Sequence, residues 1–157
     1  MSERAPDLAA AIPDGSALVT MSVAGQRFGI PIERVRDVFT ITEMTPVPLS
    51  RPDVAGLLNM RGRIVTAIDL RRRLGLPDAA AASARTAVGI EVEGDSFGLI
   101  VDRVDEIAAA DPTLADKPAH LGQPWASLSR AVHRRPDGIL IELDVDAVLA
   151  LDSPSHA

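Results

Sequence analysis

The chain has 157 residues, of which 46% are apolar and 24% charged, as expected for one ordinary globular domain or two very small ones. A net charge of −6 and an aromatic content of 3% argue against a nucleic-acid-binding surface. The absence of cysteine excludes a disulfide framework, a thiol nucleophile and a cysteine-based zinc site. It also agrees with a cytoplasmic location.

The two ends of the chain are predicted to be tails. Residues 1–16 contain charges and lack a long apolar segment, which argues against a secretory signal. No run approaches the roughly 18 apolar residues of a membrane span, so any membrane association must come through a partner. Residues 17–151 are expected to form one domain, followed by a second tail over 152–157. A tail at each end argues against a piece of a larger protein.

The first half of the domain is expected to consist of short strands separated by glycine and proline. Two strands are predicted over Ala17–Val23 and Gln26–Ile32. Glu33–Ile41 fits either a bent strand or one helical turn that enters a strand. Thr45–Asp53 contains three prolines and is predicted to be an extended loop.

A tight turn, a strand and a capped helix are predicted to close this half. The turn is expected over Asn59–Gly62 and the strand over Arg63–Ile68. Asp69 stands where a helix N-cap would accept hydrogen bonds from free amides. Arg71–Arg73 follow near the negative end of the helix dipole and are interpreted as a solvated face.

The pattern then begins again. Gly25–Val38 (GQRFGIPIERVRDV) and Gly94–Ile107 (GDSFGLIVDRVDEI) share their glycine, phenylalanine, aliphatic and charged positions in order. Gly62–Leu74 and Gly138–Leu149 each give a glycine, a strand, an aspartate cap and a short helix. The chain therefore contains an internal duplication.

The duplication predicts two small β-units, over about residues 17–76 and 86–151, with exchange of elements possible between them. Neither unit is large enough for a secure core of its own, so they are expected to share one. Phe28 and Phe97 are predicted to fill equivalent barrel cores. In the second closing turn Asp137 takes the place of Arg61.

No catalytic or metal-binding pattern is recognisable in the sequence. Walker-type glycines, a dinucleotide-binding loop and a nucleophile elbow are missing. The histidines lack metal-ligand spacing and are scattered, at His120, His133 and His156. Asp102, Asp105 and Glu106 are interpreted as a solvated or turn-facing charge run, because Glu33 and Asp37 stand in the equivalent block. A carboxylate enzyme is the weakest alternative, and no metal or cofactor is expected.

Taken together, the motifs resemble the signature of CheW-like domains. NMRGRIVTAIDLRRRLGL is similar to the family's Asn-Leu-Arg-Gly block. FGIPIERVRDV, FGLIVDRVDEI and RRPDGILIELDVDAVL are similar to the other three blocks. Thr66-Ala67 replaces a common Pro-Val, Met60 a Leu and Leu74 a frequent Phe. The resemblance implies a mainly β fold of two pseudo-repeated SH3-like five-stranded β-barrels packed around a shared core, with short helices.

The resemblance also implies a function. Family members are non-enzymatic adaptors that couple transmembrane chemoreceptors to the chemotaxis histidine kinase in arrays at the cytoplasmic side of the membrane. A receptor inserts a helical-hairpin tip into a groove between the barrels, and a regulatory domain of the kinase contacts their outer faces. Self-association in rings is possible, and nucleic-acid binding and direct membrane insertion are not expected. The alternative is the same scaffold serving another chemosensory pathway.

Candidate contact residues follow from the matching blocks and from pseudo-symmetry. The receptor-binding candidates are Arg61, Asn59, Val35, Val38 and Val104, and the kinase-binding candidates are Asp37 and Val35. An arginine among apolar neighbours suits an interface anchor, although Arg61 could instead bond carbonyls of its own turn. Val35 and Val38 could equally be core residues, and Asn59 fits a turn former better than a contact.

Overall fold

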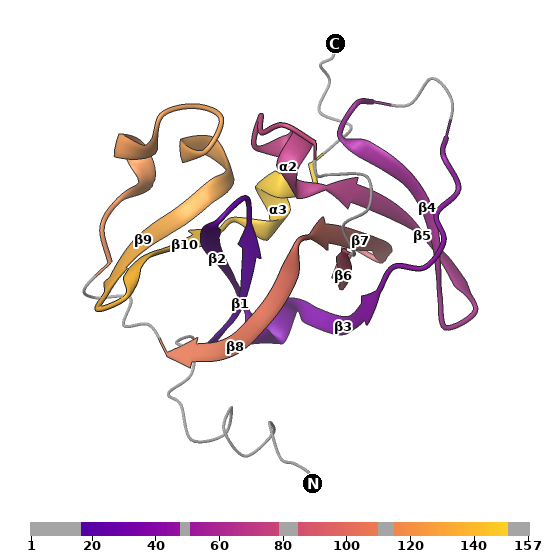
Figure 1. The fold of residues 1–157 in the computed structure, drawn as a ribbon, viewed down its shortest axis with the longest axis horizontal. Coiled ribbons are helices and arrows are strands. Elements are labelled where there is room, and N and C mark those ends of the chain that lie inside the picture. The colour runs from indigo at the N-terminus through magenta and orange to yellow at the C-terminus, as the bar shows by residue number, and fades with distance from the viewer. Residues whose placement is uncertain (1–16, 48–50, 79–84, 110–114, 151–157) are drawn as a thin grey trace, which may run out of the picture.

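The computed structural model describes residues 17–47, 51–78, 85–109 and 115–150, so both predicted tails lie outside the described residues. These residues form ten strands, two short α-helices and three 3₁₀ turns (Figure 1). The strands are β1 (Ala17–Val23), β2 (Gln26–Pro31), β3 (Val35–Thr40), β4 (Val54–Met60), β5 (Arg63–Asp69), β6 (Thr86–Val92), β7 (Asp95–Val101), β8 (Arg103–Ala109), β9 (Ser129–Arg135) and β10 (Gly138–Leu143). The helices are α2 (Leu70–Arg73) and α3 (Val145–Val148), and the 3₁₀ turns are Ile32–Arg34, Pro118–Leu121 and Ala126–Leu128.

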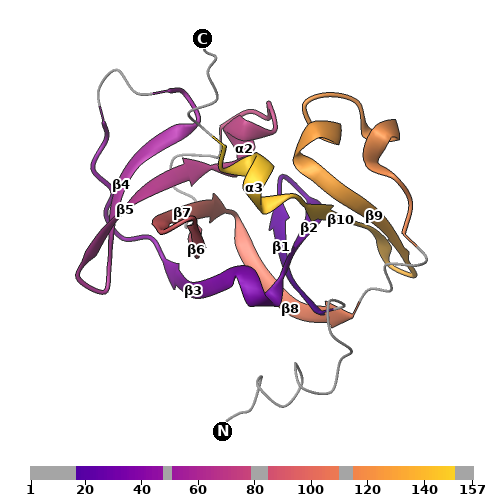
Figure 2. The same cartoon turned by 180° about the vertical axis from the view of Figure 1, so that it is seen from behind.

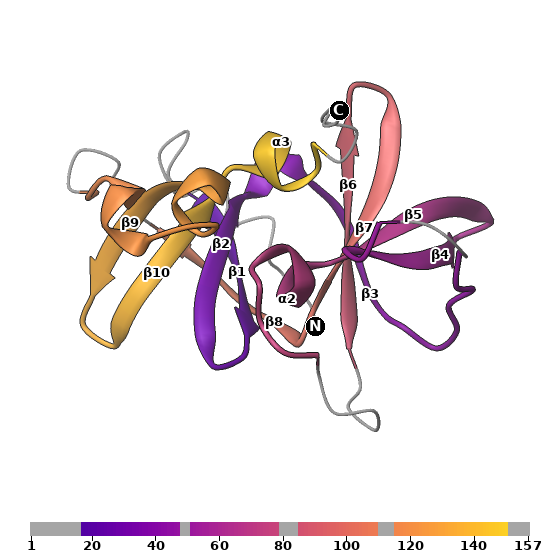
Figure 3. The ribbon, with the colours of Figure 1, turned by 90° about the horizontal axis from the view of Figure 1, so that it is seen from above.

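The strands form two five-stranded sheets, which confirms the mainly β prediction. Sheet A has the order β8-β1-β2-β10-β9, and sheet B has the order β3-β6-β7-β5-β4. Each sheet therefore takes strands from both repeats. Figure 3 shows the sheets side by side with β3 and β8 running between them. Full closure of the sheets into barrels stays a prediction.

The strand pairs of the two sheets involve equivalent positions of the two repeats. In sheet A Met21 of β1 pairs with Val104 of β8, and in sheet B Ile90 of β6 pairs with Val35 of β3. Met21 corresponds to Ile90, and Val104 to Val35, so the two sheets contain the same pair of repeat positions. The two strand pairs also carry a β-bulge at the same place. Of the two alternatives for Glu33–Ile41, the single helical turn entering a strand is correct.

The main apolar core lies between the sheets and takes buried residues from both, including Met21 and Phe28 of sheet A and Ile90 of sheet B. Phe28 is fully buried and its ring centroid lies 5.5 Å from that of Trp125. Phe97 is only half-buried and packs against this same shared core. The prediction that the two phenylalanines fill equivalent barrel cores is therefore wrong.

The helices α2 and α3 both lie in the middle of the molecule between the sheets (Figure 2). The Asp69 carboxylate caps α2 by accepting hydrogen bonds from the amides of Arg71 and Arg72, as the sequence predicted. Arg72 is exposed, as a solvated arginine face requires, but the prediction is wrong for Arg71 and Arg73. Arg71 pairs with Asp102 at 2.8 Å. Arg73 is 16% exposed and donates to the carbonyl oxygens at the end of α3 at 2.7 Å. Arg71 and Arg73 therefore both reach groups outside their own helix.

Candidate functional site

The candidate site is built on the hairpin of β4 and β5. Met60 pairs with Arg63, so only Arg61 and Gly62 form the turn. Their φ angles are 55° and 85°, which suits a tight hairpin whose twist follows that of its strands. Asn59 belongs to β4, and its side-chain oxygen accepts a hydrogen bond from the amide of Gly62 at 2.9 Å. Asn59 therefore has the turn-forming role that the sequence favoured.

The turn directs Arg61 toward β3. The Arg61 Nε lies 2.7 Å from Asp37 Oδ2, and a second hydrogen bond runs from Nη2 to Asp37 Oδ1 at 3.2 Å. The Arg61 side chain is nevertheless 81% exposed. Its described hydrogen bonds go to Asp37 and none goes to the carbonyls of its own turn, which was the alternative. The hairpin thus presents a charged pair with an accessible guanidinium.

The second repeat carries a different residue at this position. Its α3 is capped by Asp144, which corresponds to Asp69 of α2. Arg135 pairs with Gly138 across the β9–β10 hairpin, so Pro136 and Asp137 form its turn. Pro136 precedes its cap, Asp144, by the same number of residues as Arg61 precedes Asp69, so Pro136 is the counterpart of Arg61. The prediction that Asp137 takes the place of Arg61 is therefore wrong by one residue.

The valine candidates do not gather around the Arg61–Asp37 pair. Val35 and Val104 are half-buried and pack against the shared core in equivalent places. Val38 is 41% exposed and follows Asp37 directly on β3. One hollow of the described surface lies beside Arg61 and Asp37, and another lies at the start of α3. Neither is lined by these valines, so the groove between the barrels stays a prediction.

The acidic residues interpreted as a solvated charge run all have partners. Asp105 is 15% exposed; its Oδ1 lies 2.7 Å from Arg103 Nε, and its Oδ2 accepts a hydrogen bond from Ser22. Asp102 accepts two hydrogen bonds from Arg71, and these hold the pKa of Asp102 below its usual value. Glu106 accepts a hydrogen bond from Arg27 that raises the pKa of Arg27. Glu106 is 67% exposed, and Asp102 also accepts a hydrogen bond from the amide of Ala24 in the β1–β2 turn. The interpretation as a solvated or turn-facing run therefore agrees with these two residues and is wrong for Asp105. Sequence analysis missed the partners of Asp102 and Glu106 because Arg71 and Arg27 lie far from them along the chain.

No group of three or more histidine and acidic side chains with the arrangement of a metal site occurs in the part of the chain that the structure describes. Among the described residues, no helix has the length and apolar character to span a membrane.

The described strands and the capped helices lie within one region of family similarity. A family model described as a CheW-like domain matches residues 17–153. The chain belongs to the CheW-like domain family. This membership confirms the resemblance of the sequence blocks, and it places the Arg61–Asp37 pair on a CheW-like domain.

Other CheW-like proteins match most of the chain. The chemotaxis protein CheW of Treponema pallidum is 28% identical over 133 residues, which are 82% of this chain and 78% of that protein. The chemotaxis protein CheW of Bacillus subtilis is 25% identical over 151 residues, covering 96% of this chain and 97% of that protein. The crystal structure of the scaffolding protein TtCheW from Thermoanaerobacter tengcongensis matches with a TM-score of 0.78. At 23% identity, covering 87% of this chain and 94% of that one, it supports the CheW-like fold.

Proposed function

We propose that this chain is a non-enzymatic chemotaxis adaptor that couples chemoreceptors to the chemotaxis histidine kinase. The observation that carries the proposal is the CheW-like match over residues 17–153. Relatives named chemotaxis protein CheW align with most of the chain, which supports a role in the same kind of signalling. The adaptor is cytoplasmic and reaches the membrane-associated array through its partners. It builds the array by binding, including self-association in rings.

Arg61 is proposed as the central receptor contact. An exposed guanidinium offers several donors in a fixed plane, and it suits a carboxylate or carbonyl of a partner. Asn59 holds the turn beneath it, and Val38 adds exposed apolar surface beside Asp37. Val35 and Val104 are proposed to contribute where they border the shared core. Burial of such a charged pair beneath a partner would make Arg61 an energetic anchor of the contact.

The kinase contact is proposed at Asp37 and Val35. Asp37 is the ion-pair partner of Arg61, so the receptor and kinase surfaces meet at this pair. A change on one side of the pair therefore alters the surface offered to both partners. Single contacts of this kind have dissociation constants around micromolar, about −8 kcal/mol, and the array adds avidity.

The test is co-sedimentation of the purified chain with a receptor cytoplasmic fragment and the chemotaxis kinase. Arg61→Glu places a carboxylate against Asp37, and we expect binding to weaken at least tenfold. Arg134→Glu is a matched control, because Arg134 on β9 of sheet A is 82% exposed and pairs with Asp116 at 2.8 Å. The control should bind within twofold of the unmodified chain.

Circular dichroism verifies that both variants are folded. Equal binding by folded Arg61→Glu and Arg134→Glu would remove the role given to Arg61. If the unmodified chain binds neither receptor nor kinase, the adaptor proposal itself fails.

A further inference from the structure

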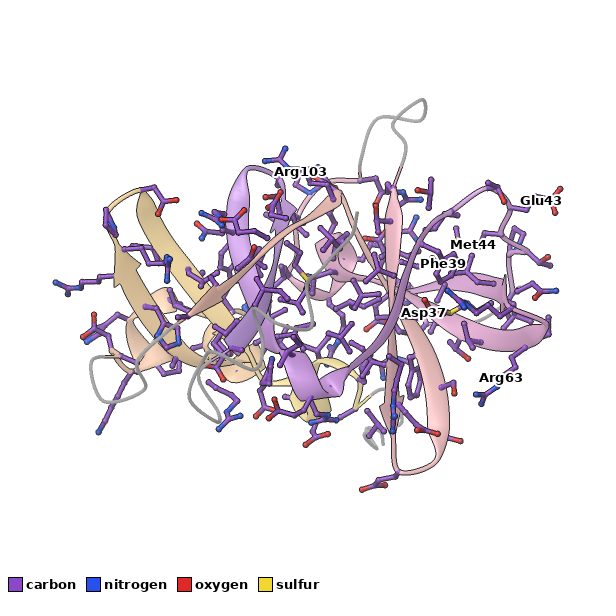
Figure 4. The ribbon with its side chains drawn as sticks, turned by 90° about the horizontal axis from the view of Figure 1, so that it is seen from below. Asp37, Phe39, Glu43, Met44, Arg63 and Arg103 are labelled. Carbon is purple, nitrogen blue, oxygen red and sulfur yellow. The ribbon has the colours of Figure 1, made fainter. Side chains whose placement is uncertain are left out.

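A hollow of about 260 Å³ opens at one end of sheet B, beside the Arg61–Asp37 pair. Apolar side chains line it from four strands, namely Met60, Val65, Ile90 and Phe97. A dry cavity of about 150 Å³ can hold benzene, so this hollow has room for one aliphatic or aromatic side chain. Figure 4 shows Asp37 and Arg63 at this end of the molecule.

The duplication offers an internal comparison, because the equivalent end of sheet A carries larger polar side chains. The first repeat has Thr20 where the second has Gly89, and Arg27 where the second has Ser96. The Thr20 hydroxyl donates to the carbonyl oxygen of Glu106. Arg27 bridges Glu106 and Asp137 with ion pairs of 2.8 and 2.6 Å. In sheet B, by contrast, glycine and serine occupy these positions, and a hollow remains beside them.

The glycine in the hollow permits a close approach of Met60 and β3. A Cβ atom at Gly89 would lie 2.7 Å from the terminal methyl of Met60 and 3.2 Å from the Cβ of Asp37. The missing side chain therefore allows Met60 to line the hollow, with β3 close behind it. Small residues at Gly89 and Ser96 and a flexible methionine together give an adaptable apolar surface.

The rim of the hollow carries an excess of positive charge. Arg61 pairs with Asp37, and Arg36 pairs with Glu91 at 3.1 Å. Arg63 donates to the hydroxyl of Ser96 at 2.9 Å, and it has no carboxylate partner among the residues that the structure describes. The Arg63 guanidinium is thus left to bind a carboxylate from outside the chain, beside the apolar residues that line the hollow.

We infer that this hollow receives an aliphatic side chain from a docking protein segment, and that Arg63 binds a carboxylate adjacent to that side chain. The inference rests on the proposed adaptor function, because the segment belongs to a partner that docks beside Arg61. The apolar lining selects the side chain and the unpaired charge selects an acidic neighbour. The site differs from the expected groove between the barrels, because the residues that line it come from sheet B alone.

The first experiment uses 4-methylpentanoate, a leucine-like chain with a carboxylate, as the probe in an amide NMR titration of the unmodified protein. We expect saturable shifts at Arg63, Gly89 and Ser96 in the millimolar range. The uncharged 4-methylpentanamide should bind at least fivefold more weakly. Absent or dispersed shifts, or equal binding of acid and amide, would overturn the inference.

Two variants test the two parts of the site separately. Arg63→Gln removes the charge and should weaken binding of the acid at least fivefold while leaving that of the amide unchanged. Ser96→Leu fills the hollow and should abolish binding of both probes. Arg134→Gln on sheet A is the matched control and should bind like the unmodified chain. Unchanged acid binding by folded Arg63→Gln contradicts the role of its guanidinium.

Co-sedimentation of the same variants with receptor and kinase separates this inference from the adaptor proposal. Loss of binding by Ser96→Leu to one partner supports the docking segment and identifies its source. Unchanged binding to both partners overturns the docking segment but leaves the adaptor proposal intact. If the unmodified chain instead self-associates in sedimentation and Ser96→Leu is monomeric, the occupant is a second copy and the inference of an external partner is wrong.

Discussion

The Arg61 guanidinium lies 2.7 Å from Asp37 and joins the two opposite sides of sheet B. Asp37 is on the edge strand β3, and Arg61 is at the tip of the hairpin that contains the other edge strand, β4. In sheet A the equivalent edges meet through Arg27, which bridges Glu106 of β8 and Asp137 of the β9–β10 turn. Each sheet therefore curls until its hairpin tip reaches its opposite edge strand, but the charges that hold it differ.

The Arg61–Asp37 pair should contribute little to stability. Because the Arg61 side chain is 81% exposed, Arg61→Ala should lower the free energy of unfolding by under about 1 kcal/mol. Urea denaturation of Arg61→Ala, Asp37→Ala and the double variant measures the coupling between them. A coupling well above this value would mean that the pair is chiefly structural and would weaken its assignment as a docking surface.

The Arg73 side chain should stabilise the contact between α2 and α3. It donates to the carbonyl oxygens of Ala147 and Val148, both at 2.7 Å. Arg73→Met keeps the aliphatic stem and removes these bonds, so it should cost about 1.5–3 kcal/mol of unfolding free energy. Arg72→Met, which loses a more exposed pair with Asp78, should cost under about 1 kcal/mol. Equal losses in urea denaturation would contradict the interhelical role.

The two aspartate caps should differ in strength. Asp69 is 2% exposed and also pairs with Arg85 at 3.0 Å, whereas Asp144 caps α3 through the amide of Ala147. Asp144→Ala should cost about 1 kcal/mol. Asp69→Ala also leaves a cation beside a buried site and should cost about 3 kcal/mol. Thermal or urea unfolding gives the order, and a larger loss at Asp144 would contradict this account.

The Asp102–Arg71 pair predicts a dependence of stability on pH. The hydrogen bonds from Arg71 lower the pKa of Asp102 in the folded chain. The stabilisation is therefore complete above the unfolded pKa of about 4 and is lost as pH falls through the lower folded value. Asp102→Asn, which keeps an acceptor for the amide of Ala24, should be less stable than the unmodified chain at pH 7.

The stability difference at Asp102 should shrink below about pH 4. Asp95→Asn, a change in the exposed end of β7, is the control and should alter stability by under about 0.5 kcal/mol at either pH. Urea midpoints at pH 7 and pH 3 provide the measurement. A difference that stays constant between these values would exclude the charge of Asp102 as its cause.

Local features of this chain could be predicted from sequence because their causes are local. The Asp69 cap depends on amides within the next three residues, and the duplication is visible as repeated residue types. The mainly β fold follows from short strands punctuated by glycine and proline. In each case the information lies within a few neighbouring positions or in a repeated pattern.

The partners of charged residues could not be predicted in this way. Arg71 reaches Asp102, Arg27 reaches Asp137 and Arg61 reaches Asp37, in each case across elements distant in sequence. The strand partners of β3 and β8 could not be predicted either. Because the two repeats have similar sequences, β3 could pair equally well with β1 or with β6, and β8 likewise. The hollow at Gly89 depends on such partners, and only a comparison of the folded repeats shows it.

The exchange of strands between the two repeats has a consequence for how the protein unfolds. A single repeat supplies only two strands of one sheet and three of the other, so it could complete a sheet only by lending strands to a second copy. The geometry is that of a domain-swapped dimer whose two halves are joined into one chain. Neither sheet can therefore melt while the other survives intact, and the chain should lose its structure in a single cooperative transition.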